Sequence, residues 1–428
     1  MIAIKYNKRK KIALYWKIII GMILGILWGI ISIKYGLKDI NIFWIKPFGT
    51  VFFNLLKLMA MPLVISSIVI GVTSVNNATR LSKIGIKAVI IYFISTLSAI
   101  LVGLILVNII KPGNFFPLDM RDDIIGNDFE TQKLSKLLLE NNNSNPISFI
   151  ESIVPDNIFN ALISNNNMLQ VIFFTIFFGI SLVMISKKDS KILIDIFNSI
   201  NESSLKIIHI IMNFAPIGVF AILSSIMIES AGNSIGNAIK LLQGLGIYSL
   251  TIILGLTLLM VIVYPLFLKI TDKNISIINF FTSISDAQLL AFSSSSSIAT
   301  LPIVMECCEK KLNVSKEISR FVLPLGATIN MDGTSLYQAI AIVFIGQIFG
   351  INLDLYQQLL IIFMVWIASI GTTGSPGSSI IMTMIVLNTL GIPSEGISIV
   401  LAVDRILDMF RTVANVAGDA MVAVIIDR

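Results

Sequence analysis

Five polar or charged residues recur along the last apolar segment of the chain, residues 395–427. They are Asp404, Asp408, Arg411, Asn415 and Asp419, separated by four, three, four and four positions. Because a helix repeats every 3.6 residues, this spacing places all five close to one stripe. An arginine fork binds a carboxylate at two points, whereas an aspartate suits an ammonium group. The stripe predicts a ligand site. A purely stabilising pair of Asp408 with Arg411 is the simpler alternative.

The composition indicates that this stripe lies in a membrane protein. The 428 residues are 55% hydrophobic and only 13% charged, whereas soluble domains are about 25% charged. The net charge of +6 does not indicate nucleic-acid binding, because the basic residues gather in alternate short loops. That distribution orients helices with these loops in the cytoplasm. We expect a multi-pass protein of the inner (plasma) membrane, surrounded by lipid, with both termini cytoplasmic.

The elements that position the stripe are apolar runs long enough to cross about 30 Å of hydrocarbon, which takes ~20 residues. Six such spans are expected near residues 15–34, 47–75, 86–110, 164–186, 204–231 and 238–270. The acidic, Asn-rich connection from Lys111 to Asn145 is expected outside the cell. Charged residues inside a membrane face an interior or a cavity and are functional by default. The spans must therefore surround the stripe.

After residue 270, polar runs interrupt the apolar segments. The runs are "SSSSS" at 293–297, "GATINMDGT" at 326–334 and "GTTGSPGSS" at 371–379. Unpaired backbone groups cannot face lipid, so such interruptions must be buried in protein or line a watery cavity. Several broken segments in one half of a membrane protein indicate a substrate site built from helix ends.

The basic loops predict how these segments cross. Residues 275–310 enter and leave on the cytoplasmic side, as a re-entrant hairpin with the serines at its tip. Residues 318–348 cross outward with a break, residues 357–392 form a hairpin from outside, and residues 395–427 cross back. A hairpin and a helix from each side make an inverted repeat. We expect an all-α integral membrane fold of eight transmembrane helices plus two re-entrant helical hairpins.

The chemistry of these groups predicts the class of ligand. Helix N-termini at the hairpin tips and Arg411 suit carboxylates, and Asp408 suits an ammonium group. An acidic amino acid carries two carboxylates and one ammonium, and therefore satisfies all three. Asp332 and Asp419, with carbonyls of the unwound "GATINMDGT", are oxygen ligands for a hard cation. Na⁺ is the expected coupling ion, with no organic cofactor.

Four motifs in order carry a resemblance to a known family: "SSSSSIATLP", "LPLGATINMDGTSLYQ", "ASIGTTGSPG" and "DMFRTVANVAGD". They closely resemble the glutamate/aspartate:cation symporters, also called dicarboxylate/amino acid:cation symporters. The resemblance implies an elevator-type homotrimer that imports L-aspartate or L-glutamate with Na⁺. It also implies two regions. In residues 1–270, spans 1, 2, 4 and 5 would form the scaffold and the trimer contacts. Spans 3 and 6 of the same region would move with the transport core, which is residues 271–428.

The resemblance also implies the site residues. The amino acid would contact Ser296, Ser297, Thr334, Gly374, Ser375, Pro376, Asp408, Arg411, Thr412 and Asn415. One sodium site would use carbonyls of Gly326, Asn330 and Asn415 with Asp419. Another would use Thr328, Ser369, Ile370 and Thr372 beside Met331. A further site would use Asp332 and Asn330 with Tyr92, Ser95 and Thr96.

Some positions depart from the family. Many prokaryotic relatives have an arginine at Ser295 and animal relatives have one at Met409, whereas this chain has neither. Gln338 stands where animal transporters have a glutamate associated with proton and potassium coupling, which favours Na⁺ coupling without potassium exchange. Arg405 is interpreted as a packed or interfacial residue without a role.

Other functions remain as alternatives. A proton-coupled acidic amino acid symporter or a C4-dicarboxylate symporter would have the same fold. A channel is disfavoured, because selectivity filters repeat one loop about a pore and these two tips differ in sequence. An intramembrane enzyme would need a nucleophile and a base, and the only histidine lies far along the chain from the polar cluster. We therefore do not expect an enzyme.

Overall fold

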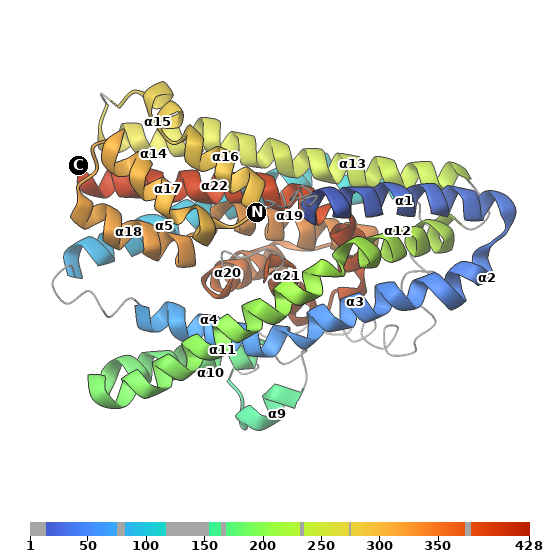
Figure 1. Cartoon of the computed structure of the whole chain (residues 1–428), viewed down its shortest axis with the longest axis horizontal. Coiled ribbons are helices and arrows are strands. Elements are labelled where there is room, and N and C mark those ends of the chain that lie inside the picture. Colours follow the sequence, from blue (N-terminus) through green and yellow to red (C-terminus); the bar gives the residue numbers. More distant parts are fainter. Residues whose placement is uncertain are drawn as a thin grey trace, which may run out of the picture.

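The computed structural model describes residues 14–74, 82–116, 154–163, 168–231, 235–273, 275–372 and 378–428. Within these ranges the regular structure is entirely helical, as the sequence predicts (Figure 1). Five helical stretches are long and apolar enough to cross a membrane, or six if one bent pair counts as a span. The five are Trp16–Tyr35, Lys38–Ile70, Gly85–Phe115, Ile239–Thr271 and Ser394–Asp427.

The first half of the chain forms helices over the expected apolar runs, with the short helices α2 and α9 outside them. They are α1 (Leu14–Tyr35), α2 (Lys38–Ile40), α3 (Lys46–Leu58), α4 (Ala60–Ser74), α5 (Ser82–Ile110), α9 (Ile158–Ile163), α10 (Met168–Met184), α11 (Lys187–Asn213), α12 (Ala215–Ala231), α13 (Ile235–Leu258) and α14 (Tyr264–Thr271). Short π-helical turns, Asn41–Ile45 and Leu259–Val263, join α2 to α3 and α13 to α14.

The run expected as one span near 204–231 differs from the prediction. It consists of the end of α11 and all of α12, and the two helices meet at Phe214 with a bend of 58°. Pro216 follows directly in the first turn of α12. Proline has no N–H to donate to the preceding turn, so it interrupts a helix interior but is tolerated in a first turn. α11 therefore ends and α12 begins there.

The second half contains the broken segments that the polar runs predict. Its helices are α15 (Ile277–Ser283), α16 (Ser285–Ser294), α17 (Ser297–Lys310), α18 (Lys316–Ile329), α19 (Asp332–Ile348), α20 (Leu355–Gly371), α21 (Ser378–Thr389) and α22 (Ile397–Asp427). The serine run separates α16 from α17, and Asn330 with Met331 separates α18 from α19. Each interruption therefore ends a helix and begins another.

The strongest contacts define two groups of helices, which also touch each other, because α12 contacts α13 and α22, and α4 contacts α20. Figure 1 shows these helices. In one group α1 and α3 pack against α12, while α10 and α11 pack against α4. In the other, α22 contacts α13, α16, α17, α18 and α19, and α5 runs against α19. The polar stripe of α22 thus lies among the hairpin and the broken helices, which is where its side chains can find partners.

Candidate functional site

The serine run closes a tight turn between two helices. Ser295 adopts a left-handed conformation, with φ 51° and ψ 36°, and ends α16. Ser296 begins α17, because its hydroxyl accepts a hydrogen bond of 3.3 Å from the N–H of Ala299. Ser297 is buried and Ser296 is half-buried. The N-terminal end of α17, where a helix leaves its first N–H groups without partners in the preceding turn, therefore lies at this tip.

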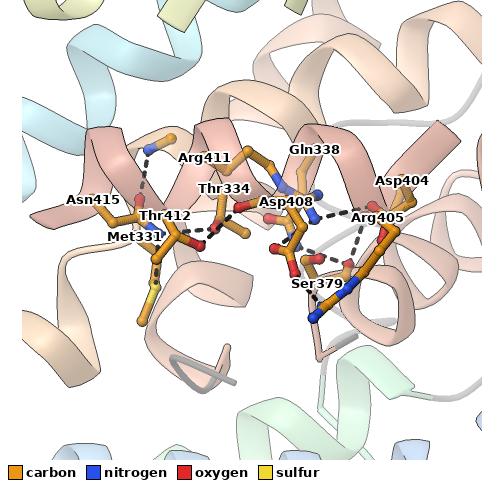
Figure 2. A network of polar contacts seen from close by, with 12 residues as sticks. Met331, Thr334, Gln338, Ser379, Asp404, Arg405, Asp408, Arg411, Thr412 and Asn415 are labelled. Atoms are coloured by element: carbon orange, nitrogen blue, oxygen red, sulfur yellow. Dashed lines mark hydrogen bonds and ion pairs between the residues drawn. The ribbon is translucent and has the colours of Figure 1, made fainter. Parts of the chain in front are cut away.

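Arg411 is the centre of the stripe on α22. Its Nη2 lies 3.0 Å from Oδ1 of Asp404 and 2.8 Å from Oδ1 of Asp408 (Figure 2). Its guanidinium carbon lies 3.8 Å from the centroid of the Tyr337 ring, and the side chain is fully buried. Among the described residues, Nε and Nη1 of Arg411 have no hydrogen-bond partner. Two donors of the fork are therefore available to a ligand.

Arg405 has a polar contact that the sequence interpretation missed. Its Nη1 lies 3.2 Å from Oδ2 of Asp408, the oxygen that Arg411 does not contact (Figure 2). The interpretation of Arg405 as a packed residue without a role is therefore incomplete. The signal was present, because residues three positions apart on a helix are neighbours and opposite charges pair there.

Asn415 joins α22 to the beginning of α19. Its Oδ1 accepts a hydrogen bond of 2.8 Å from the N–H of Gly333, and its Nδ2 lies 3.2 Å from the Thr334 hydroxyl and 3.4 Å from the Met331 sulfur. The Thr412 hydroxyl donates to the carbonyl of Asp408, at 2.8 Å. The structure therefore brings Thr334 to the stripe, together with Met331, which the motifs place beside Thr328, Ser369, Ile370 and Thr372.

Asp419 lies at the break between α18 and α19. Its Oδ1 accepts a hydrogen bond of 3.0 Å from Nδ2 of Asn330. A Cβ on Gly326 would come within 2.5 Å of both Asp419 Oδ1 and the Tyr92 hydroxyl, so only glycine leaves room for these oxygens. Within the described residues, Oδ1 of buried Asn330 has no partner. The Asp419 carboxylate, the Asn330 amide and the Tyr92 hydroxyl thus lie close together at this break.

Asp332 accepts hydrogen bonds from hydroxyl groups of α5. Thr96 donates to Oδ1 at 2.7 Å, and Ser95 donates to Oδ2. The hydroxyl of Tyr264 lies 3.2 Å from Oδ2 as well, a contact that no motif predicted. Tyr92 instead donates to the carbonyl of Val322 at 2.9 Å. Ser95 and Thr96 therefore hydrogen-bond to Asp332, whereas the Tyr92 hydroxyl hydrogen-bonds to the backbone of α18.

The remaining expected sodium ligands use their hydroxyl groups inside their own helices. Thr328 donates to the carbonyl of Leu325 at 2.8 Å, Ser369 to that of Trp366 at 2.7 Å, and Thr372 to that of Ala368 at 2.7 Å. The helices that carry them, α18 and α20, pack against each other. The side chain of Ile370 and the tip residues Gly374, Ser375 and Pro376 lie outside the described part of the chain.

A surface hollow of about 780 Å³ lies elsewhere, between α3, α4 and α11. Leu58, Pro62, Ile196 and Ile200 are among its lining residues, and none of the site residues named above is. The polar chemistry is therefore separate from this apolar hollow.

Comparison with known proteins decides the family. The sodium:dicarboxylate symporter family matches residues 14–428. The chain belongs to this family. The resemblance drawn from the four motifs is thereby confirmed, and the chain is a membrane protein of a transporter family.

Curated relatives of this family match almost the whole chain. The proton/sodium-glutamate symport protein of Bacillus subtilis (strain 168) is 33% identical over 98% of this chain and 94% of its own length. The proton/glutamate-aspartate symporter of Escherichia coli (strain K12) is 31% identical over 98% and 93%. The excitatory amino acid transporter 3 of Homo sapiens is 32% identical over 95% and 84%. The likeness to the symporters thus extends over both helix groups.

Proposed function

We propose that this protein is a secondary active symporter that imports L-aspartate or L-glutamate with Na⁺ as the coupling ion. The observation that carries the proposal is the buried Arg411, which presents two unpartnered donor nitrogens beside the Asp408 carboxylate. Relatives named for glutamate, and for glutamate and aspartate, symport support the same substrate class.

The amino acid would bind between the serine tip and α22. Nε and Nη1 of Arg411 would hold the side-chain carboxylate by two charge-assisted hydrogen bonds. Asp408 would accept the ammonium group. The N–H groups at the beginning of α17, beside Ser296 and Ser297, would hold the main-chain carboxylate. Further contacts are proposed for Thr334, Gly374, Ser375, Pro376, Thr412 and Asn415.

Sodium ions would bind beside the buried aspartates Asp332 and Asp419. In the described part of the chain, Asp332 and Asp419 bond only to hydroxyl and amide groups and form no ion pair. An unpaired buried charge is costly, so a cation beside each carboxylate would stabilise it. Oxygen atoms are the ligands that hard cations prefer. We therefore propose three Na⁺ sites. One is at Asp419 with Gly326, Asn330 and Asn415, and another is at Asp332 with Asn330, Tyr92, Ser95 and Thr96. The third is at Thr328, Ser369, Ile370 and Thr372, beside Met331.

The proposal includes eight transmembrane helices, two re-entrant hairpins and an inverted repeat. The two packing groups support a division of labour. The first group, α1 to α4 with α9 to α12, would be the scaffold of a homotrimer in the plasma membrane. The second, with α5, α13, α14 and residues 271–428, would move as an elevator. Both termini would be cytoplasmic.

Proton coupling is the alternative, because two of the relatives carry the words proton/sodium or proton in their names. Buried Gln338 favours Na⁺, since its amide donates to the Ser379 carbonyl at 3.4 Å and has no titratable proton. A C4-dicarboxylate substrate is the other alternative, and it would leave Asp408 without an ammonium partner.

Uptake of radiolabelled L-aspartate into proteoliposomes tests the function. We expect an inward Na⁺ gradient to drive accumulation, and a proton gradient without Na⁺ to drive none. Asp419→Asn is expected to abolish the Na⁺ dependence, whereas Asp195→Asn, which changes an exposed aspartate on α11, is expected to transport normally. Accumulation driven by the proton gradient alone would favour the alternative coupling. Absence of aspartate and glutamate uptake under both gradients would refute the symporter.

A further inference from the structure

The Asp408 carboxylate is contacted by two basic side chains, one at each oxygen. Arg411 holds Oδ1 at 2.8 Å and Arg405 holds Oδ2 at 3.2 Å. In Figure 2 the two guanidinium groups reach Asp408 from different directions. The group proposed to bind the ammonium of the substrate therefore already has a cation at both oxygens.

The two arginines are held very differently. Arg411 has no exposed side-chain surface, contacts Asp404 as well as Asp408, and stacks on the Tyr337 ring. Arg405 keeps 12% of its side chain exposed, and Asp408 is its ion-pair partner among the described residues. Its Nε is buried without a hydrogen-bond partner in the same part of the chain. Arg405 is thus the more weakly held of the two, and the one that another cation can replace.

We infer that Arg405 is a specificity-determining residue, an internal cation that occupies Oδ2 of Asp408 and is displaced by the ammonium group of an amino acid. This inference rests on the proposed role of Asp408. Because the substrate ammonium must compete with Arg405, the arginine lowers the affinity for aspartate. A dicarboxylate without an ammonium group leaves Arg405 in place, so Asp408 stays neutralised and repels this ligand less. Arg405 thereby lowers the ratio of the affinity for an amino acid to the affinity for a plain dicarboxylate.

Arg405→Gln tests the competition, because it removes the charge and keeps a long polar side chain. In proteoliposomes the KM for L-aspartate is expected to fall about tenfold, the size of one charge-assisted hydrogen bond. The concentration of succinate that half-inhibits aspartate uptake is expected not to fall. Arg405→Lys keeps a cation and is expected to stay within about twofold of the wild type, as is Arg320→Gln, a charge change at an exposed position of α18.

The outcomes separate this inference from the proposed function. An unchanged or raised KM in folded Arg405→Gln protein, with wild-type uptake intact, would overturn the competition and leave the symporter standing. A wild type that takes up no L-aspartate would instead remove the proposed function itself. If Arg405→Gln is not recovered as folded protein, Arg405→Met carries the same expectation, since it also removes the charge and fills the apolar part of the space.

Discussion

α1 and α22 are both long helices of a membrane protein, and they differ in what surrounds them. The span of α1, Trp16–Tyr35, has a mean hydropathy of 2.1 and is 33% buried, whereas that of α22, Ser394–Asp427, has 1.5 and is 78% buried. A charged residue at the centre of a membrane helix costs roughly 2.5–3.5 kcal/mol on insertion scales. Other helices cover the charged face of α22, so that cost is offset by ion pairs and hydrogen bonds.

The two helices also differ in how they contact their neighbours. α1 approaches α12 through glycines, and a Cβ on Gly25 would lie 2.7 Å from the carbonyl oxygen of Phe220. Small residues of this kind let two helix backbones pack closely in lipid. α22 also has a close glycine, since a Cβ on Gly418 would lie 2.9 Å from the Tyr264 hydroxyl, but it contacts its neighbours through polar side chains such as Arg411 and Asn415 as well. We therefore expect changes in α1 to alter stability and changes in α22 to alter transport as well.

The largest effect is expected from Arg411→Ala, because it leaves Asp404 and Asp408 close together without their shared base. Removing one partner of a buried ion pair costs about 3–5 kcal/mol. Uptake of L-aspartate should fall more than about 100-fold, while a neutral amino acid, which needs no second carboxylate partner, should lose less. Radiolabelled uptake in proteoliposomes measures both, with Arg320→Ala as an exposed control. Full aspartate affinity in the variant would contradict the role of Arg411.

A matched pair of leucines compares the two helices without any change of charge. Leu407 of α22 is 1% exposed and Leu24 of α1 is 51% exposed. Leu407→Ala leaves a cavity and should lower the free energy of unfolding by about 2–5 kcal/mol. Leu24→Ala should change it by less than about 0.5 kcal/mol. Thermal unfolding of the purified proteins measures both. Equal losses would mean that α1 is covered as completely as α22.

The sequence predicts the helices better than it predicts their partners. Hydropathy located α1 and α5, and the 3.6-residue period identified the face of α22 that carries Arg411. Polar runs marked the helix ends at Ser295 and at Asn330. All of these are local properties, because composition and period are readable within a single segment.

Contacts between distant segments could not be predicted in this way. Tyr264 meets Asp332 across 68 positions of the chain, and no spacing rule links a tyrosine in one span to an aspartate in another. The bend at Phe214 was also missed, since apolar residues continue on both sides of it and hydropathy does not report a change of helix direction. Arg405 is different, because its pair with Asp408 follows from helical spacing. Arg411 also lies three positions from Asp408, and the prediction included only that pair.

Gly25→Ala tests whether packing alone governs α1. The added methyl group would overlap the backbone of α12, and overpacking of this kind typically costs about 1–3 kcal/mol. The midpoint of thermal unfolding should fall while the KM for L-aspartate stays unchanged. Gly246→Ala in α13 is the matched control, because no atom beyond its own stretch of helix lies within 4 Å of its Cβ position in the described structure. A change in KM without loss of stability would show that α1 takes part in substrate binding.

The smallest effect is expected from the aromatic ring beneath Arg411. Tyr337→Leu removes the ring that lies 3.8 Å from the guanidinium carbon, and a cation–π contact contributes about 0.5–2 kcal/mol. If the ring holds the Arg411 fork in position for the carboxylate that we propose it binds, the KM for L-aspartate should rise by a few-fold up to about thirtyfold. Tyr337→Phe keeps the ring and should change KM by less than about twofold. Similar increases in both variants would assign the effect to the hydroxyl group instead. If neither variant changes KM, then the ion pairs with Asp404 and Asp408 are enough to orient Arg411. The burial of α22 would then act on transport through these ion pairs and not through the Tyr337 ring.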